Sequence, residues 1–189
     1  MGVSTTWTGA SSSAWNTAGN WTNGVPVATG TAIIDGAVDI TGGAPANNEV
    51  DRFYVASTYT GALGSTGTPL EIDSAEVSID NGTSGSTHYL HLEGANNATP
   101  AVVVDGLKTG NALYLSGDID RLLVKTSFLG TLHLGNSASK QAVPNDVVVN
   151  TSSGIVDATV AANVAWVTAA EVHVTNGTLK LGENIGQDS

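Results

Sequence analysis

Short apolar strands recur along this chain at nearly constant spacing, and this repeat limits the possible folds more than any other feature. Each copy ends its first strand on a Val or Ile that serves as an anchor: Val55, Ile79, Val104, Val124, Val149 and Val174. Successive anchors lie 24, 25, 20, 25 and 25 residues apart. Self-similarity at a period of this size is typical of solenoids. Rungs of 20–25 residues with variable turns predict an all-β, single-domain, right-handed parallel β-helix of about six rungs.

Alternation around the anchors predicts which side chains face the core, because residues two apart in a strand lie on the same face. The residues two before each anchor are all apolar: Phe53, Val77, Val102, Leu122, Val147 and Val172. The residues three before each anchor are mostly charged: Arg52, Glu76, Ala101, Arg121, Asp146 and Glu171. The residues one after it are mostly polar: Ala56, Asp80, Asp105, Lys125, Asn150 and Thr175. We therefore expect two inward columns and two outward columns along the solenoid.

A second strand in each rung shows the same alternation. Its inward pairs are apolar: Leu90 and Leu92, Leu113 and Leu115, Leu132 and Leu134, Val156 and Ala158, Leu179 and Leu181. The residues between these pairs are predicted to point outward in one column: His91, Tyr114, His133, Asp157 and Lys180. On this alignment His91 and His133 are two rungs apart, roughly 9–10 Å at the spacing of paired strands. One metal ion cannot bind both directly, so solvated histidines are expected, and a bridge across an oligomer axis is the alternative.

One outward column is partly apolar, although outward residues are expected to be polar. The residues one before each anchor are Tyr54, Ser78, Val103, Leu123, Val148 and His173. Three consecutive rungs thus present an apolar stripe of Val103, Leu123 and Val148, with Tyr54 further along the same column. Exposed apolar patches of this kind usually mark an interface. We expect an intermolecular interface here, in a homotrimer packed about a threefold axis; the alternative is that a long turn or the C-terminal tail folds over the stripe.

The first 36 residues differ from the repeat and hold three of the four tryptophans, Trp7, Trp15 and Trp21. The open end of a solenoid exposes core and unpaired backbone, so it needs a cap. We predict a capping segment over residues 1–36 and the solenoid over residues 37–189, as parts of one domain. A sugar-stacking platform formed by the tryptophans is the alternative.

A resemblance supports this division. The pattern Trp-x-Gly at 7–9, Trp15, Ala-x-Asn-Trp at 18–21 and Gly-x-Pro at 24–26 precedes a strand with paired isoleucines. This segment resembles the N-terminal segment of bacterial autotransporter-like surface proteins and of some phage structural proteins. Those families often have Gly-Asp after the proline, where this chain has Gly30-Thr31. The resemblance implies a parallel β-helix displayed on a cell surface or a virion, and it brings no catalytic residues with it.

Charge and composition exclude several classes of function. The chain has 17 acidic and 6 basic residues and a net charge of -11, which opposes nucleic-acid binding. It has no cysteine, so neither disulfides nor a thiolate site is expected. The N-terminus does not read as a signal peptide, and no apolar run is long enough for a membrane span. We therefore expect synthesis in a host cytoplasm and no membrane partner.

An outward ladder of Asp80, Asp105, Lys125 and Asn150 allows one enzymatic interpretation. Polysaccharide-cleaving β-helices use stacked acids with calcium and a basic residue, and adjacent carboxylates raise each other's pKa. Such enzymes also need a cleft built by long loops, whereas most turns here are short, so a solvated ladder is the preferred interpretation. We predict no catalytic residue, no metal ligand, no cofactor-binding residue and no cofactor.

These observations together predict a non-enzymatic structural protein of a phage virion, a capsid decoration or cement protein whose partner is the major capsid protein or another virion protein. The first alternative is a fragment of a bacterial adhesin or autotransporter passenger at the cell surface. The second is a glycan-binding or polysaccharide-cleaving β-helix module.

Overall fold

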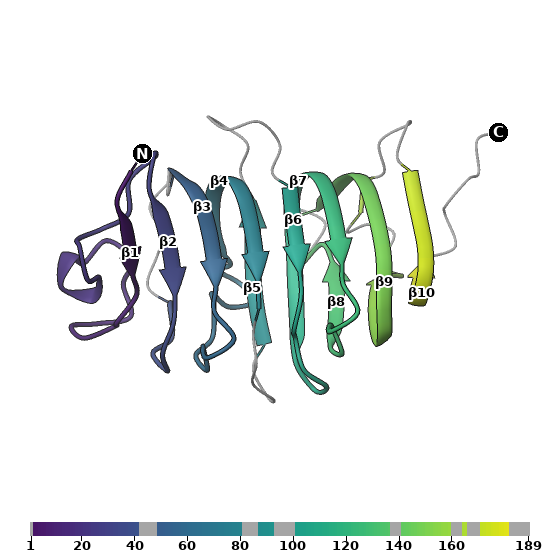
Figure 1. Cartoon of the computed structure of the whole chain (residues 1–189), viewed down its shortest axis with the longest axis horizontal. Coiled ribbons are helices and arrows are strands. Elements are labelled where there is room, and N and C mark those ends of the chain that lie inside the picture. Colours follow the sequence, from purple (N-terminus) through teal and green to yellow (C-terminus); the bar gives the residue numbers. More distant parts are fainter. Residues whose placement is uncertain are drawn as a thin grey trace.

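The computed structural model describes residues 2–41, 49–80, 87–92, 101–136, 141–159, 164–165 and 171–181. Every pairing between its strands is parallel, and the strands stack side by side along one axis (Figure 1). The elements are β1 (Ser4–Thr6), the 3-10 helix η1 (Ala18–Asn20), β2 (Thr31–Ile34), β3 (Glu49–Val55), β4 (Leu70–Ile79), β5 (Thr87–Leu92), β6 (Ala101–Val104), β7 (Ala112–Val124), β8 (Thr131–Leu134), β9 (Ala142–Ala158) and β10 (Glu171–Leu181).

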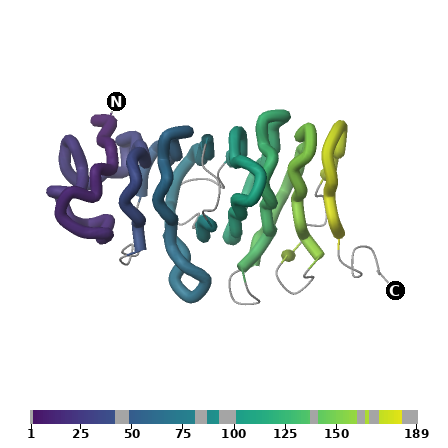
Figure 2. The backbone as a smooth tube through the Cα atoms, turned by 90° about the horizontal axis from the view of Figure 1, so that it is seen from below, coloured from purple at the N-terminus to yellow at the C-terminus, as the bar shows by residue number. Residues whose placement is uncertain are grey.

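The chain is a parallel β-solenoid of about six coils, as the repeat predicts. Its coils follow one another along the axis from the N-terminal to the C-terminal end (Figure 2). Two ladders run along it. The first face is the ladder β2-β3-β4-β6-β7-β9-β10, and the second face is the ladder β4-β5-β7-β8-β9-β10. The long strands β4, β7, β9 and β10 take part in both ladders, so they join the two faces.

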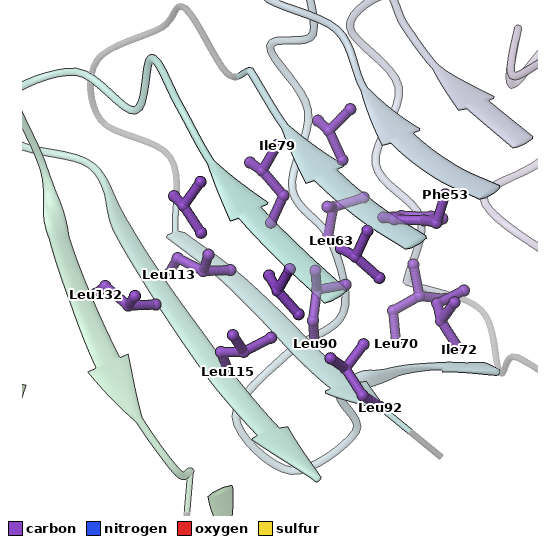
Figure 3. Packing of buried hydrophobic residues seen from close by; sticks show 14 of the residues in the cluster. Phe53, Leu63, Leu70, Ile72, Ile79, Leu90, Leu92, Leu113, Leu115 and Leu132 are labelled. Carbon is purple, nitrogen blue, oxygen red and sulfur yellow. The ribbon is translucent and has the colours of Figure 1, made fainter. Parts of the chain in front are cut away.

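The anchor column of the first face is confirmed. The six anchors are opposite one another in adjacent strands, and Ile34 of β2 adds one more position to the column. The column two residues earlier is also confirmed, from Phe53 to Val172. Side chains from both faces fill the space between the ladders, and Phe53, Ile79, Leu90 and Leu113 belong to this one core (Figure 3). Burial of these columns is what holds successive coils together.

The predicted alignment of outward residues on the second face is wrong by two residues at one coil. The structure places Tyr89, and not His91, opposite Tyr114, while His91 lies opposite Ser116. The reason is that His88 points inward and is buried, so a polar residue occupies a position that the apolar pattern assigns to Leu90. Gly117 allows this register: it has φ 91°, and a Cβ there would overlap the carbonyl oxygen of Leu92.

A smaller correction concerns the last coil of the first face. The register of β10 shifts between Val174 and Asn176, so Asn176 and not Thr175 lies opposite Asn150. The inserted residue is a β-bulge, which bends a strand locally. The bulge leaves the anchor column unchanged, because Val174 still lies opposite Val149.

At the N-terminal end, the three tryptophans lie against the first coils and are almost fully buried, with 1%, 1% and 5% exposure for Trp7, Trp15 and Trp21. Trp21 makes edge-to-face contacts with Trp7 and Trp15, at ring distances of 5.2 and 4.7 Å, and Trp15 stacks on Phe53 at 6.2 Å. Their burial leaves no open ring face on which a sugar could stack. The stacked sheet begins within this segment, since β1 pairs with β2, and β2 pairs with β3.

Asn20 organises the loop that carries these tryptophans. Its side chain is buried, and its Oδ1 accepts hydrogen bonds from the backbone N–H groups of Ser11 and Ser12 at 2.8 and 2.9 Å. Its Nδ2 donates to the Ser12 hydroxyl at 3.0 Å and to the Ala14 carbonyl at 2.8 Å. Because all four bonds are made inside the loop, the polar atoms of the buried amide are satisfied and the bonds link Ser11, Ser12 and Ala14 to the Asn20 side chain.

The last described coil is more open. Val172, Val174 and Leu181 of β10 occupy inward columns, yet they are 39%, 48% and 46% exposed. Their neighbours in β9, Val147, Val149 and Ala158, are 0–2% exposed. Among the described strands, β10 pairs with β9 alone, so its other side has no strand to cover the core.

Candidate interaction surface

The apolar stripe lies in the middle of the first face. Register places the members of its column opposite one another in successive strands: Ile33, Tyr54, Ser78, Val103, Leu123, Val148 and His173. Val103, Leu123 and Val148 are each half-buried, so every one of them keeps part of its side chain open to solvent. The three lie on consecutive coils, about 4.8 Å apart. They therefore form one continuous apolar stripe.

A groove continues the stripe toward the N-terminal end. Its volume is about 340 Å³, and it lies over the first three coils of the face. The lining residues come from two outward columns: Thr31, Ile33, Arg52, Tyr54, Glu76 and Ser78. The small side chain of Ser78 occupies the column position that Val103 and Leu123 fill on the following coils. The face is thus hollow near Ser78 and raised near Leu123.

A charged column borders the stripe on the side of Arg52. The Arg52 guanidinium donates to Glu76 Oε2 from Nη2 at 2.7 Å and from Nε at 3.1 Å. Two coils further on, Arg121 Nε lies 3.3 Å from Asp146 Oδ2. All four side chains are between 32% and 57% exposed, so each ion pair adds little to folding stability. Their charges remain available for a partner.

A second polar column borders the stripe on the other side. Lys125 Nζ lies 3.4 Å from Asp105 Oδ2, and Asp80 lies one coil before Asp105. Partial burial raises the pKa of Asp80, as does the charge of Asp105, while Lys125 acts in the opposite direction. Within the described ranges, no group of three or more histidine or acidic side chains is placed to hold a metal ion.

The second face carries a stacked ladder that the sequence analysis did not find. Tyr89 stacks on Tyr114 with ring centres 4.7 Å apart and 10° between the planes. Tyr114 in turn stacks on His133 at 4.4 Å and 12°. His133 Nδ1 lies 3.6 Å from Asp157 Oδ2 on the next coil. The sequence alignment already placed Tyr114 next to His133, but it missed the contact of Tyr89 with Tyr114, because this contact depends on the shifted register of β5.

Titration of the ladder follows from its burial. Burial lowers the pKa of His133, and Lys180 adds to this effect while Asp157 opposes it, so the ring is neutral at pH 7. Burial raises the pKa of Tyr114, and the neighbouring Tyr89 and Asp157 raise it further. Burial would raise the pKa of Asp157, but hydrogen bonds from Thr159 and the nearby His133 and Lys180 outweigh it, so this pKa is lowered.

Comparison of the chain with family models, with curated proteins and with solved structures found no match. Along the described part of the chain, no helix is long and apolar enough to cross a membrane.

Proposed function

We propose that this protein is a non-enzymatic structural component of a phage particle, a rigid β-solenoid that decorates the capsid and associates through the stripe of its first face. The observation that carries the proposal is the stripe of Val103, Leu123 and Val148, which is only partly buried and is continuous over three coils. A surface of this kind is suited to contact with another protein.

Rigidity supports the same function. Parallel ladders run through the solenoid, and consecutive coils are joined both by backbone hydrogen bonds and by apolar columns that are almost fully buried. At the N-terminal end, buried tryptophans lie against the first coils and limit access to the core. A body built in this way can hold two surfaces at a fixed separation, which is what a cement protein does on a shell.

The assignment to a phage particle rests on the resemblance of the N-terminal segment, which holds Trp7, Trp15 and Trp21. The test uses particles of the phage that carries the gene, purified with the gene intact and with the gene deleted. We expect the protein in intact particles, and we expect deletion particles to release DNA at a lower temperature. Particles that lack the protein, or deletion particles with unchanged composition and stability, would contradict the proposal.

The same resemblance also includes autotransporter-like surface proteins, so a passenger fragment of a bacterial adhesin is the second candidate. The sequence that neighbours this segment in the genome distinguishes the two candidates. An adhesin requires a secretion signal upstream or a β-barrel translocator downstream of this segment in the full gene. A decoration protein is expected beside a major capsid gene.

A further inference from the structure

We propose that the first face forms a twofold contact between two copies of this chain whose solenoid axes run in opposite directions. The inference rests on the proposed association through the stripe and adds the partner, the number of copies and their orientation. Three outward columns carry it: the charged column that includes Arg52, the stripe column, and the polar column that includes Lys125. In this arrangement each column of one copy faces the same column of the other copy, and the coils of the two copies follow one another in opposite order.

The charges of the charged column match those of the same column in a second copy that runs in the opposite direction. From coil to coil its charges are positive at Arg52, negative at Glu76, zero at Ala101, positive at Arg121 and negative at Asp146. Reversal about Ala101 brings Arg52 opposite the partner copy's Asp146, and Glu76 opposite its Arg121. Both contacts occur twice in the dimer, so eight of the ten charged side chains of this column face an opposite charge. The remaining two, Glu171 of each copy, face the uncharged Thr31 of the other copy.

The side chains of the stripe column also match in size when the second copy runs in the opposite direction. The small Ser78 faces Leu123 of the other copy, and Tyr54 faces its Val148. The groove of about 340 Å³ beside Ser78 and Tyr54 therefore receives the raised part of the stripe, and Val103 meets its own copy at the axis. Packed sheets are about 10 Å apart, which is within reach of these side chains.

The polar column adds one further favourable contact. Asp80 faces the Lys125 of the other copy, on both sides of the axis. Asp105 faces its own equivalent, but each Asp105 carboxylate is paired with Lys125 of its own chain at 3.4 Å, which reduces the repulsion.

Packing with parallel axes is unfavourable in comparison. About a threefold axis, or a twofold axis along the solenoid, coils of equal number meet and the charged column of one copy faces the polar column of the next. Glu76 then lies beside Asp80 of the neighbour, and Arg121 lies beside its Lys125. Like charges that face each other disfavour such an interface. The charge order therefore favours two antiparallel copies over the threefold assembly that the sequence analysis predicts.

The test reverses the charges of the column in a variant with Arg52→Glu, Glu76→Arg, Arg121→Glu and Asp146→Arg. Each ion pair within the chain still joins one positive and one negative side chain. The same holds for each charged contact between two variant copies. The variant is mixed with isotope-labelled original protein and examined by native mass spectrometry. We expect dimers of the variant and dimers of the original protein, with mixed dimers about tenfold below their statistical share. Statistical mixing, or a three-chain species, would overturn the antiparallel contact.

Two half-reversed variants form the matched control. One carries Arg52→Glu and Glu76→Arg, and the other carries Arg121→Glu and Asp146→Arg, so each keeps its ion pairs within the chain. Each alone should dissociate at concentrations where the original protein is dimeric, and their mixture should form dimers of one chain of each. Failure of the mixture to pair overturns the antiparallel contact. If all variants and the original protein remain single chains, the dimer is overturned, while the particle experiment still decides whether the protein decorates a capsid.

Discussion

The two faces of the solenoid share one core and the same coils, but their outward columns are built from side chains of different shape. On the second face, the flat rings of Tyr89, Tyr114 and His133 stack at 4.7 and 4.4 Å, so they cover each other within the chain. On the first face, the branched side chains of Leu123 and Val148 stand side by side and remain partly exposed. The large outward side chains of the second face therefore contact one another through their ring faces, whereas those of the first face form a partly exposed apolar stripe.

The largest expected effect separates inward from outward residues within one strand. Leu122 is fully buried, whereas Leu123 beside it belongs to the stripe. Leu122→Ala should lower the free energy of unfolding by about 2–5 kcal/mol, because it removes core contacts and leaves a cavity. Leu123→Ala should change the stability of the single chain by less than about 1 kcal/mol and should weaken self-association. Urea denaturation of dilute samples measures the first effect; equal losses for both variants would contradict the assignment of faces.

The next effect concerns acid, and it arises from the buried His88 of the second face. Burial lowers the pKa of His88 to about 4, whereas the unfolded chain takes up this proton near pH 6.5. Between these values the unfolded state binds more protons, so stability falls as the pH falls from about 6.5 to about 4, by up to about 3 kcal/mol. The inward columns of the first face hold only apolar residues, from Phe53 to Val174, and contribute no such term.

The variant His88→Gln removes this titration while it keeps a polar side chain in place. Denaturation midpoints measured across this pH range should depend less on pH in the variant than in the original protein. His173→Gln, at an exposed position of β10, is the matched control for replacing a histidine by glutamine outside the core. The same slope in all three proteins would show that His88 does not titrate in this way.

A smaller effect is expected from the aromatic ladder. Tyr114→Ala removes both stacking contacts and should lower the free energy of unfolding by about 1–2 kcal/mol without changing the oligomeric state. In the original protein, the phenol of Tyr114 should also ionise above the usual pH 10, because burial and the neighbouring Tyr89 raise its pKa. Thermal denaturation and ultraviolet titration measure the two effects; a variant that loses self-association would place the partner surface on the second face.

The first face was predictable because its anchor column and the column two residues earlier hold only apolar residues, so alternation around the anchors fixed the register from Val55 to Val174. The second face was not, because the buried His88 is polar and made Leu90 look like the first inward residue of its coil. That shift of two residues concealed the stack of Tyr89 on Tyr114. Side-chain pattern alone could not reveal a buried histidine, since its burial depends on the surrounding coils.

The candidate surface was predictable in part. Val103, Leu123 and Val148 are apolar residues at outward positions, which are expected to be polar, so the stripe could be recognised before its exposure was known. The groove beside Ser78 required the structure, because its depth comes from how Tyr54 and Ile33 are placed around it. The order of charges from Arg52 to Glu171 was also predictable, because alternation around the anchors places these residues in one column, and the register of the strands confirms it.

The central claim is that the stripe of the first face joins separate chains, and sedimentation equilibrium of Leu123→Asp tests it most directly. Ile155→Asp is the matched control, because Ile155 is also half-buried and points outward, but on the second face. The account predicts that the original protein and Ile155→Asp have the mass of two chains, and that Leu123→Asp has the mass of one chain with an unchanged circular dichroism spectrum. A folded Leu123→Asp variant that keeps the mass of the original protein would contradict it.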